Sequence, residues 1–141
     1  MDEAKLAMLM SRGRIAIGVS ALAVPGFFAK RMSGRSETSG VEVPFARMLG
    51  ARDLALGLGA VIALDRGAPV RGWLEAAALA DAVDCLASVA SRKQLGRGGF
   101  VGTVTLASIA AVAGAVLARR LDPAPPAHPG QPEAAVTGHS H

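Results

Sequence analysis

The sequence predicts an all-α fold: an antiparallel four-helix bundle in a membrane, followed by a disordered, proline-rich tail. The 141 residues are 51% hydrophobic and only 18% charged, whereas average soluble domains carry about 25% charged residues. Residues 100–118 contain no charge at all. The charged residues gather at the ends of four apolar runs, as they do at membrane boundaries. A small alanine-rich soluble bundle is the alternative, and the long uncharged run argues against it.

The first predicted span covers residues 15–29 and begins just after Arg14. This length is short for a membrane crossing. The segment is therefore a buried or interfacial helix, or a span extended back over residues 6–10. Pro25 and Gly26 are expected to kink or loosen its end. The basic start also resembles a signal peptide, but the cleavage site is poor and three more apolar runs follow.

The second and third spans, residues 45–64 and 72–91, form a hairpin because only a short turn rich in Gly and Pro separates them. The fourth span, residues 100–118, reaches about 28 Å at a rise of about 1.5 Å per residue, close to the hydrocarbon thickness of a bilayer. Small side chains let membrane helices pack closely. The candidate packing positions are Gly50, Gly57, Ala107, Ala111 and Gly114.

Residues 1–121 are expected to form the membrane domain, and residues 122–141 the tail, because the tail is Pro-rich and lacks apolar periodicity. Four antiparallel spans place both termini on one side of the cell membrane. The orientation is not determined, since seven Lys and Arg residues flank the spans on the termini side and six on the other. We expect the lipid bilayer as one partner, and a second copy or another membrane protein as the other.

Span two carries the pattern of a buried carboxylate. At helical spacing, Asp53 shares a face with Gly50 and Gly57. A neighbouring helix can come close along a face of such small residues. Arg52 lies beside this face, and Arg47 points to another side near the start of the helix. The pattern therefore indicates a charged group held between helices.

Span three has a matching stripe, with Asp81 and Asp84 on one face. Measured from the turn, Asp84 lies level with Arg52 and Asp53. A charged side chain in mid-membrane costs about 2.5–3.5 kcal/mol on insertion, so it should face inward and be paired. Arg52 is therefore expected to pair with Asp84, and with Asp81 or Asp53 as a second partner, because a planar guanidinium can bind two carboxylates.

The predicted network contains one more acid than base. Either burial keeps one carboxyl group protonated, or a cation or a cationic ligand group completes the site. The simpler interpretation is that the ion pairs only hold the helices in register. The members of this candidate ligand-binding or ion-pair network are Arg47, Arg52, Asp53, Asp81 and Asp84.

Other kinds of site find little support. The Lys and Arg residues form no single face or arm and have no interleaved aromatic residues, which argues against nucleic-acid binding. No nucleophile–base pair and no metal-binding motif occurs, so we expect no catalytic residue, metal or cofactor. Two of the three histidines, His139 and His141, could approach a metal ion, but the tail fixes no third ligand near them.

The stretch at residues 46–57 resembles a motif, A-R-x-x-G-x-R-(D/E)-x-x-L-G, in the second helix of small four-helix membrane proteins of actinobacterial type. They form an uncharacterised domain family. The chain looks more distantly like DoxX-type four-helix membrane proteins. The resemblance covers about residues 10–118 and implies a membrane location with about four spans, but no established activity. It rests on Ala46, Arg47, Gly50, Arg52, Asp53 and Gly57.

Three functions are compatible with these features. The first is non-enzymatic: an accessory or self-associating helical bundle, favoured by the short loops and the absence of a catalytic set. The second is a binding or transport site for a small ligand, a lipid or a proton, built on the charged network. The third is a membrane enzyme of isomerase type that uses one carboxyl group as general acid or base.

Overall fold

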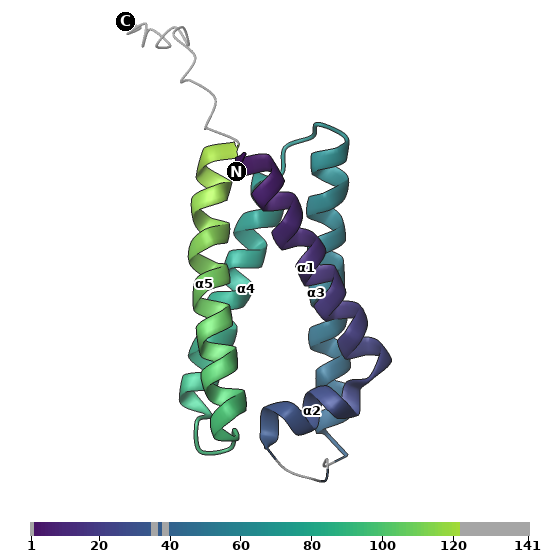
Figure 1. Ribbon diagram of the computed structural model, residues 1–141, viewed down its shortest axis with the longest axis vertical. Coiled ribbons are helices and arrows are strands. Elements are labelled where there is room, and N and C mark those ends of the chain that lie inside the picture. Colours follow the sequence, from purple (N-terminus) through teal and green to yellow (C-terminus); the bar gives the residue numbers. More distant parts are fainter. Residues whose placement is uncertain (1, 35–36, 38–39, 122–141) are drawn as a thin grey trace, which may run out of the picture.

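Five α-helices make up the described part of the computed structural model, residues 2–34, 37 and 40–121, in which there is no strand (Figure 1). The predicted all-α fold is thereby confirmed. The expected disordered tail, residues 122–141, lies outside the described residues, as do its histidines. The helices are α1 (Glu3–Ala23), α2 (Pro25–Ser33), α3 (Glu42–Asp65), α4 (Arg71–Ala90) and α5 (Arg97–Leu121).

For the first span, the expected bounds of residues 15–29 are wrong, and the alternative of a helix that extends back over residues 6–10 is confirmed. Helix α1 begins at Glu3 and ends at Ala23. Pro25 has no N–H to donate to the preceding turn, but its fixed φ suits the first turn of a new helix, so it starts α2. The expected kink is thus a break between two helices. Arg14 lies near the middle of α1 rather than at its boundary.

Helices α3 and α5 extend two of the other predicted spans by a few residues, and α4 is shifted by one residue from the third. Helix α3 takes in Pro44, which a first helical turn tolerates because its missing N–H has no partner there. Two glycines in the left-handed region end helices or turns: Gly34 with φ of 70° after α2, and Gly67 with φ of 61° before α4. Glycine adopts this conformation without the steric cost that a Cβ brings.

The four long helices pack as two pairs, α1 on α3 and α4 on α5, and the pairs contact each other more sparsely. Helix α2 crosses one end of the bundle, where it packs on α3 and α5 (Figure 1). At the other end, Arg120 Nη1 lies 2.9 Å from Glu3 Oε1. The start of α1 and the end of α5 therefore lie at the same end of the molecule.

Small residues dominate the interior of the bundle. Its buried apolar side chains are mostly alanines, and no large side chain in the described residues is fully buried. Large apolar side chains face outward on all four long helices, where the following examples are 60–70% exposed: Leu9, Met48, Leu86 and Val112. Close contact between helices here depends on the small residues.

Two helices, α1 and α5, are long and apolar enough to cross a membrane. Helices α3 and α4, with 24 and 20 residues, are of similar length but carry more charged residues along a membrane-length stretch. A core helix of a soluble protein can be equally long and apolar, and so can a signal sequence. The two helices by themselves are therefore weak evidence for a membrane.

Candidate functional site

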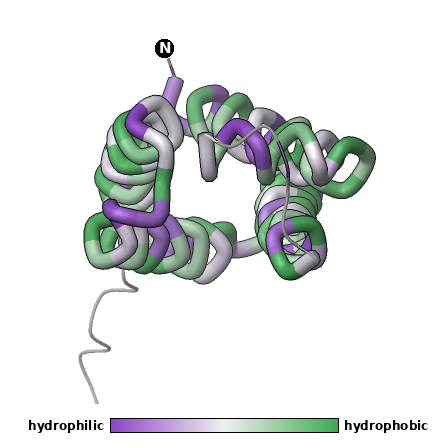
Figure 2. Tube along the Cα trace, turned by 90° about the horizontal axis from the view of Figure 1, so that it is seen from below, coloured by the Kyte–Doolittle hydropathy of each residue, from purple (hydrophilic) through white to green (hydrophobic). Residues whose placement is uncertain are grey.

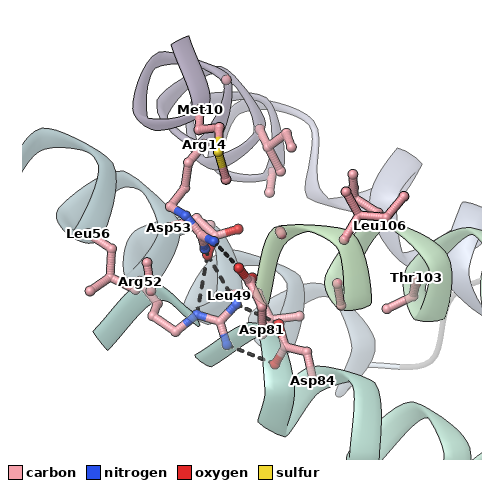
Figure 3. Close-up of a pocket in the computed structure, with 18 of the residues that line it drawn as sticks. Met10, Arg14, Leu49, Arg52, Asp53, Leu56, Asp81, Asp84, Thr103 and Leu106 are labelled. Atoms are coloured by element: carbon pink, nitrogen blue, oxygen red, sulfur yellow. Dashed lines mark hydrogen bonds and ion pairs between the residues drawn. The ribbon is translucent and has the colours of Figure 1, made fainter. Parts of the chain in front are cut away.

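Arg52 links α3 to α4 through its guanidinium group. Its Nη1 donates to Asp84 Oδ1 at 2.8 Å, and its Nη2 donates to Asp84 Oδ2 at 2.6 Å. Its Nε and Nη2 also donate to Asp53 Oδ1, at 3.3 and 3.0 Å (Figure 3). The planar fork of arginine fits a carboxylate in this bidentate way. Arg52 thus has the Asp84 partner that the sequence predicts, with Asp53 as the second.

Arg14, on α1, is the member of this cluster that the sequence reasoning missed. Its Nη1 donates to Asp53 Oδ1 at 2.9 Å, and its Nη2 donates to Asp81 Oδ2. Only 13% of its side chain is exposed. One arginine therefore connects α1 to both α3 and α4 (Figure 3).

A sequence signal for Arg14 does exist once α1 is allowed to begin at Glu3. Small or buried residues then recur at spacings of three and four along one helix face, and Arg14 falls in that series. The expected span began after Arg14, so the residue was assigned to a membrane boundary. The residues that share the face are Ala7, Ser11, Arg14, Gly18 and Ala21.

Arg47 does not join this cluster. It is exposed, and it makes no ion pair or hydrogen bond with a described residue. Five residues before Arg52, it lies about 140° around the axis of α3 at 3.6 residues per turn. The charged cluster of the structure therefore consists of Arg14, Arg52, Asp53, Asp81 and Asp84.

This cluster forms part of the wall of a cavity of about 760 Å³ between the two helix pairs. Figure 2 looks along the bundle and shows the helices arranged around this central region. Apolar side chains make up most of the rest of the wall, with Leu49 and Leu56 on α3 and Leu106 on α5. Figure 3 shows Leu106 and Thr103 of α5 beside the charged cluster.

The two ends of the bundle are packed more tightly than its middle. At the α2 end, the Gly96 N–H donates to Met32 O at 3.2 Å, and a Cβ added at Gly99 would lie 2.2 Å from the same oxygen. At the other end, an apolar cluster including Leu74 and Leu117 fills the interior. Between these ends the cavity wall includes Leu106 and Ile109 of α5, which are 58% and 63% exposed.

The three glycines among the predicted packing residues lie at helix contacts. A Cβ added at Gly50 would lie 2.8 Å from Gly18 O, and one at Gly57 would lie 2.8 Å from Ser11 O, so both glycines bring α3 against the backbone of α1. Gly114 faces Ala78 of α4, where an added Cβ would be 3.3 Å from the alanine Cβ. On α5, Ala107 is buried, and Ala111 is half-buried.

The chemistry available in the cavity is that of charge and hydrogen bonding. Two guanidinium groups face three carboxylates, so the cluster has a formal charge of −1 when all are ionised. In the described part of the chain, no three His, Cys, Asp or Glu side chains are grouped so that they could hold a metal ion. The arrangement suits recognition of a polar or charged group on a largely apolar molecule.

The fold and the site define an all-α bundle of two helix pairs with a charged cluster on the wall of a central cavity. Comparisons of this chain with known protein families, with curated proteins and with solved structures find no match. The resemblance to small four-helix membrane proteins, carried by the motif at residues 46–57, therefore stays a prediction.

Proposed function

We propose that this chain is a multi-pass protein of the cell membrane and that its central cavity binds a small, mostly apolar ligand. In this proposal the four long helices α1, α3, α4 and α5 all cross the bilayer. At about 1.5 Å per residue, their lengths of 20–25 residues correspond to about 30 Å or more, the thickness of a hydrocarbon core.

The distribution of large and small residues supports the membrane location. Soluble proteins bury most of their large apolar side chains and rarely expose wide apolar patches. Here many large apolar side chains face outward, whereas alanine and glycine fill most of the helix contacts. In a bilayer, lipid tails contact the exposed apolar side chains. Small residues allow the close packing of helices that membrane bundles require.

The position of the charged groups is also that expected within a bilayer. Arg14, Asp53 and Asp81 lie near the middle of their helices, and their side chains are 10–16% exposed. Charged groups at this depth are costly unless they face inward and pair with one another. The pairs formed by the cluster explain how α3 and α4 carry their charges and still cross a membrane.

The cavity is the main observation that supports ligand binding. Its volume of about 760 Å³ falls in the range of about 300–1,000 Å³ that is typical of small-molecule sites. Its wall combines a large apolar surface with a few converging polar groups, as such sites do. An accessory bundle held only by helix contacts would need no such cavity, so the structure favours the ligand-binding function over that interpretation.

Native mass spectrometry of the protein purified in mild detergent tests this function. We expect the wild-type protein to carry a small molecule, because a cavity of this size between membrane helices attracts apolar ligands. Ala110→Trp places a large side chain in the cavity wall and should remove the bound mass. Val112→Trp, on the outer face of α5 where the residue is 66% exposed, should retain it.

Circular dichroism and size-exclusion chromatography establish that both tryptophan variants are folded. A wild-type protein without any bound small molecule would contradict the proposal. So would a bound mass that survives Ala110→Trp unchanged, because the ligand would then lie on the outer surface of the helices.

A further inference from the structure

The hydrogen bonds of the charged cluster leave two carboxylate oxygens free. Asp53 accepts only through Oδ1, and Asp81 accepts only through Oδ2, while both oxygens of Asp84 are occupied by Arg52. Asp53 Oδ2 and Asp81 Oδ1 therefore have no donor among the described residues. The excess negative charge of the cluster lies at these two groups.

The two aspartates that carry these free oxygens line the cavity. No buried side-chain oxygen of the described residues lacks a hydrogen-bond partner, so neither oxygen is sealed inside protein. Asp53 and Asp81 both line the cavity, which is the open space next to them. Asp81 is only 7% exposed as a residue. A carboxylate buried to this degree is costly unless its remaining acceptor is satisfied.

Arg14 holds the two carboxylates side by side. Its Nη1 and Nη2 bind one oxygen of each, so Asp53 and Asp81 lie close together at one guanidinium group (Figure 3). The nitrogens of Arg52 are likewise all turned toward carboxylates. The site therefore offers two free carboxylate oxygens, while all three nitrogens of Arg52 and two of the three nitrogens of Arg14 already bind carboxylates.

We propose that the ligand of the cavity is an amphipathic organic cation, with its ammonium group against Asp53 and Asp81. This inference rests on the proposed ligand-binding function and specifies its chemistry. An ammonium group donates up to three hydrogen bonds, so it satisfies both free oxygens and neutralises the excess charge. The apolar part of the ligand then lies along Leu49, Leu56 and Leu106, which line the same cavity.

A metal ion and an anion fit this site less well. The three aspartates do not converge as metal ligands, because arginines occupy four of their six oxygens. An anion would face the two free carboxylate oxygens. Arg31 also lines the cavity, but its Nη1 lies near Gly98 at the α2 end, and it bonds to none of the aspartates.

Three ten-carbon probes of the same length test the inference: decylamine, decan-1-ol and decanoate. Their binding is measured at pH 7 on nanodiscs of phosphatidylcholine with and without the full-length protein. We expect decylamine to bind about tenfold or more tightly than decanol, the effect of a hydrogen-bonded charge. Asp53→Asn and Asp81→Asn should each remove most of this preference, because they weaken decylamine binding far more than decanol binding.

Glu75→Gln is the matched control, because Glu75 is an exposed partner of Arg71 on α4 and does not line the cavity. It should keep the wild-type preference for the amine. If Asp81→Asn does not fold, as judged by size-exclusion chromatography, Asp53→Asn alone decides the outcome, since the amide side chain introduced there retains an oxygen for Arg14.

The outcomes separate the inference from the function on which it rests. Equal binding of amine and alcohol would mean that a proton balances the cluster, and would overturn the inference while the cavity remained a ligand site. Tighter binding of decanoate would overturn it as well and assign the preference to Arg31. Binding of none of the three probes would contradict the proposed function itself.

Discussion

Arg14 connects two helices that otherwise lie apart. Helices α1 and α4 make no direct backbone contact, yet Arg14 reaches from α1 to Asp81 on α4 while it also binds Asp53 on α3. A guanidinium group is suited to this role because it stays charged and its donors point in fixed directions. At the scale of single residues, this side chain joins the two helix pairs beside the cavity.

Arg14→Gln should therefore destabilise the protein by about 3–5 kcal/mol, the range for removing one partner of a buried ion pair. The loss arises because Asp53 and Asp81 are left as neighbouring carboxylates without the positive charge of Arg14 between them. Unfolding by SDS titration of the purified protein measures the change.

Arg12→Gln provides the control for this prediction. Arg12 lies two residues earlier on the same helix and is exposed, with no hydrogen bond or ion pair to a described residue. Its substitution removes the same charge and should change stability by less than about 0.5 kcal/mol. Equal losses in the two variants would show that the charge of α1, rather than the bridge, matters.

At the scale of the helices, the close contact between α1 and α3 depends on Gly18. A Cβ added at Gly18 would lie 2.6 Å from Leu54 N and 2.7 Å from Gly50 O, which are backbone atoms that cannot rotate away. Close approach of this kind is how small residues stabilise helix pairs in lipid. The pair also places Arg14 within reach of Asp53.

Gly18→Ala should reduce stability by about 1–3 kcal/mol, because the added methyl group forces the two helices apart. Gly13→Ala, on the same helix, should be neutral or stabilise by up to about 1 kcal/mol, since an added Cβ there meets nothing within 4 Å. Thermal unfolding of both variants in the same detergent measures the difference. A stabilising effect at Gly18 would contradict the close contact of α1 and α3.

The positions of most helices could be predicted from the sequence. The main error in this prediction, at the first span, has a physical cause. Helices α3, α4 and α5 match the expected spans because apolar runs flanked by Gly, Pro and charge mark such helices well. The start of the first span, placed at residue 15, was wrong because Arg12 and Arg14 resemble boundary residues when only local composition is considered. Arg12 is exposed, whereas Arg14 is neutralised by aspartates that lie 39 and 67 residues away in sequence.

At the scale of the whole molecule, two helix pairs enclose a cavity. Both ends of the helical domain lie at one end of the bundle (Figure 1). The ends of the bundle are packed through α2 and through an apolar cluster. The middle stays open because charged pairs, rather than interlocking side chains, link α3 to α4 there. The cavity is a consequence of the whole arrangement and belongs to no single helix.

The proposed membrane topology predicts the location of four points along the chain. Reporter fusions before Asp2 and after Leu121 should report the same side of the membrane, as should an insertion near Ala68. An insertion near Lys93 should report the opposite side. The reason is that α1, α3, α4 and α5 each cross once and α2 lies across one end.

The same protein should stay in the membrane pellet after extraction with alkaline carbonate, which releases peripheral proteins. Release into the supernatant would contradict the membrane proposal and favour a soluble alanine-rich bundle. Reporters at Ala68 and Lys93 on one side would instead contradict the crossing of α4 alone.

The sequence by itself determined the helical class, the bounds of three long helices to within a few residues and the level at which Arg52 meets Asp84. These depend on local periodicity and on a short turn, which are properties of neighbouring residues. Only the tertiary structure decided that Arg14 belongs to the charged cluster, that Arg47 does not, and that a cavity lies beside it. Those features depend on where α1 and α5 pack against residues distant in sequence, and close contacts between backbones, such as that at Gly18, set their positions.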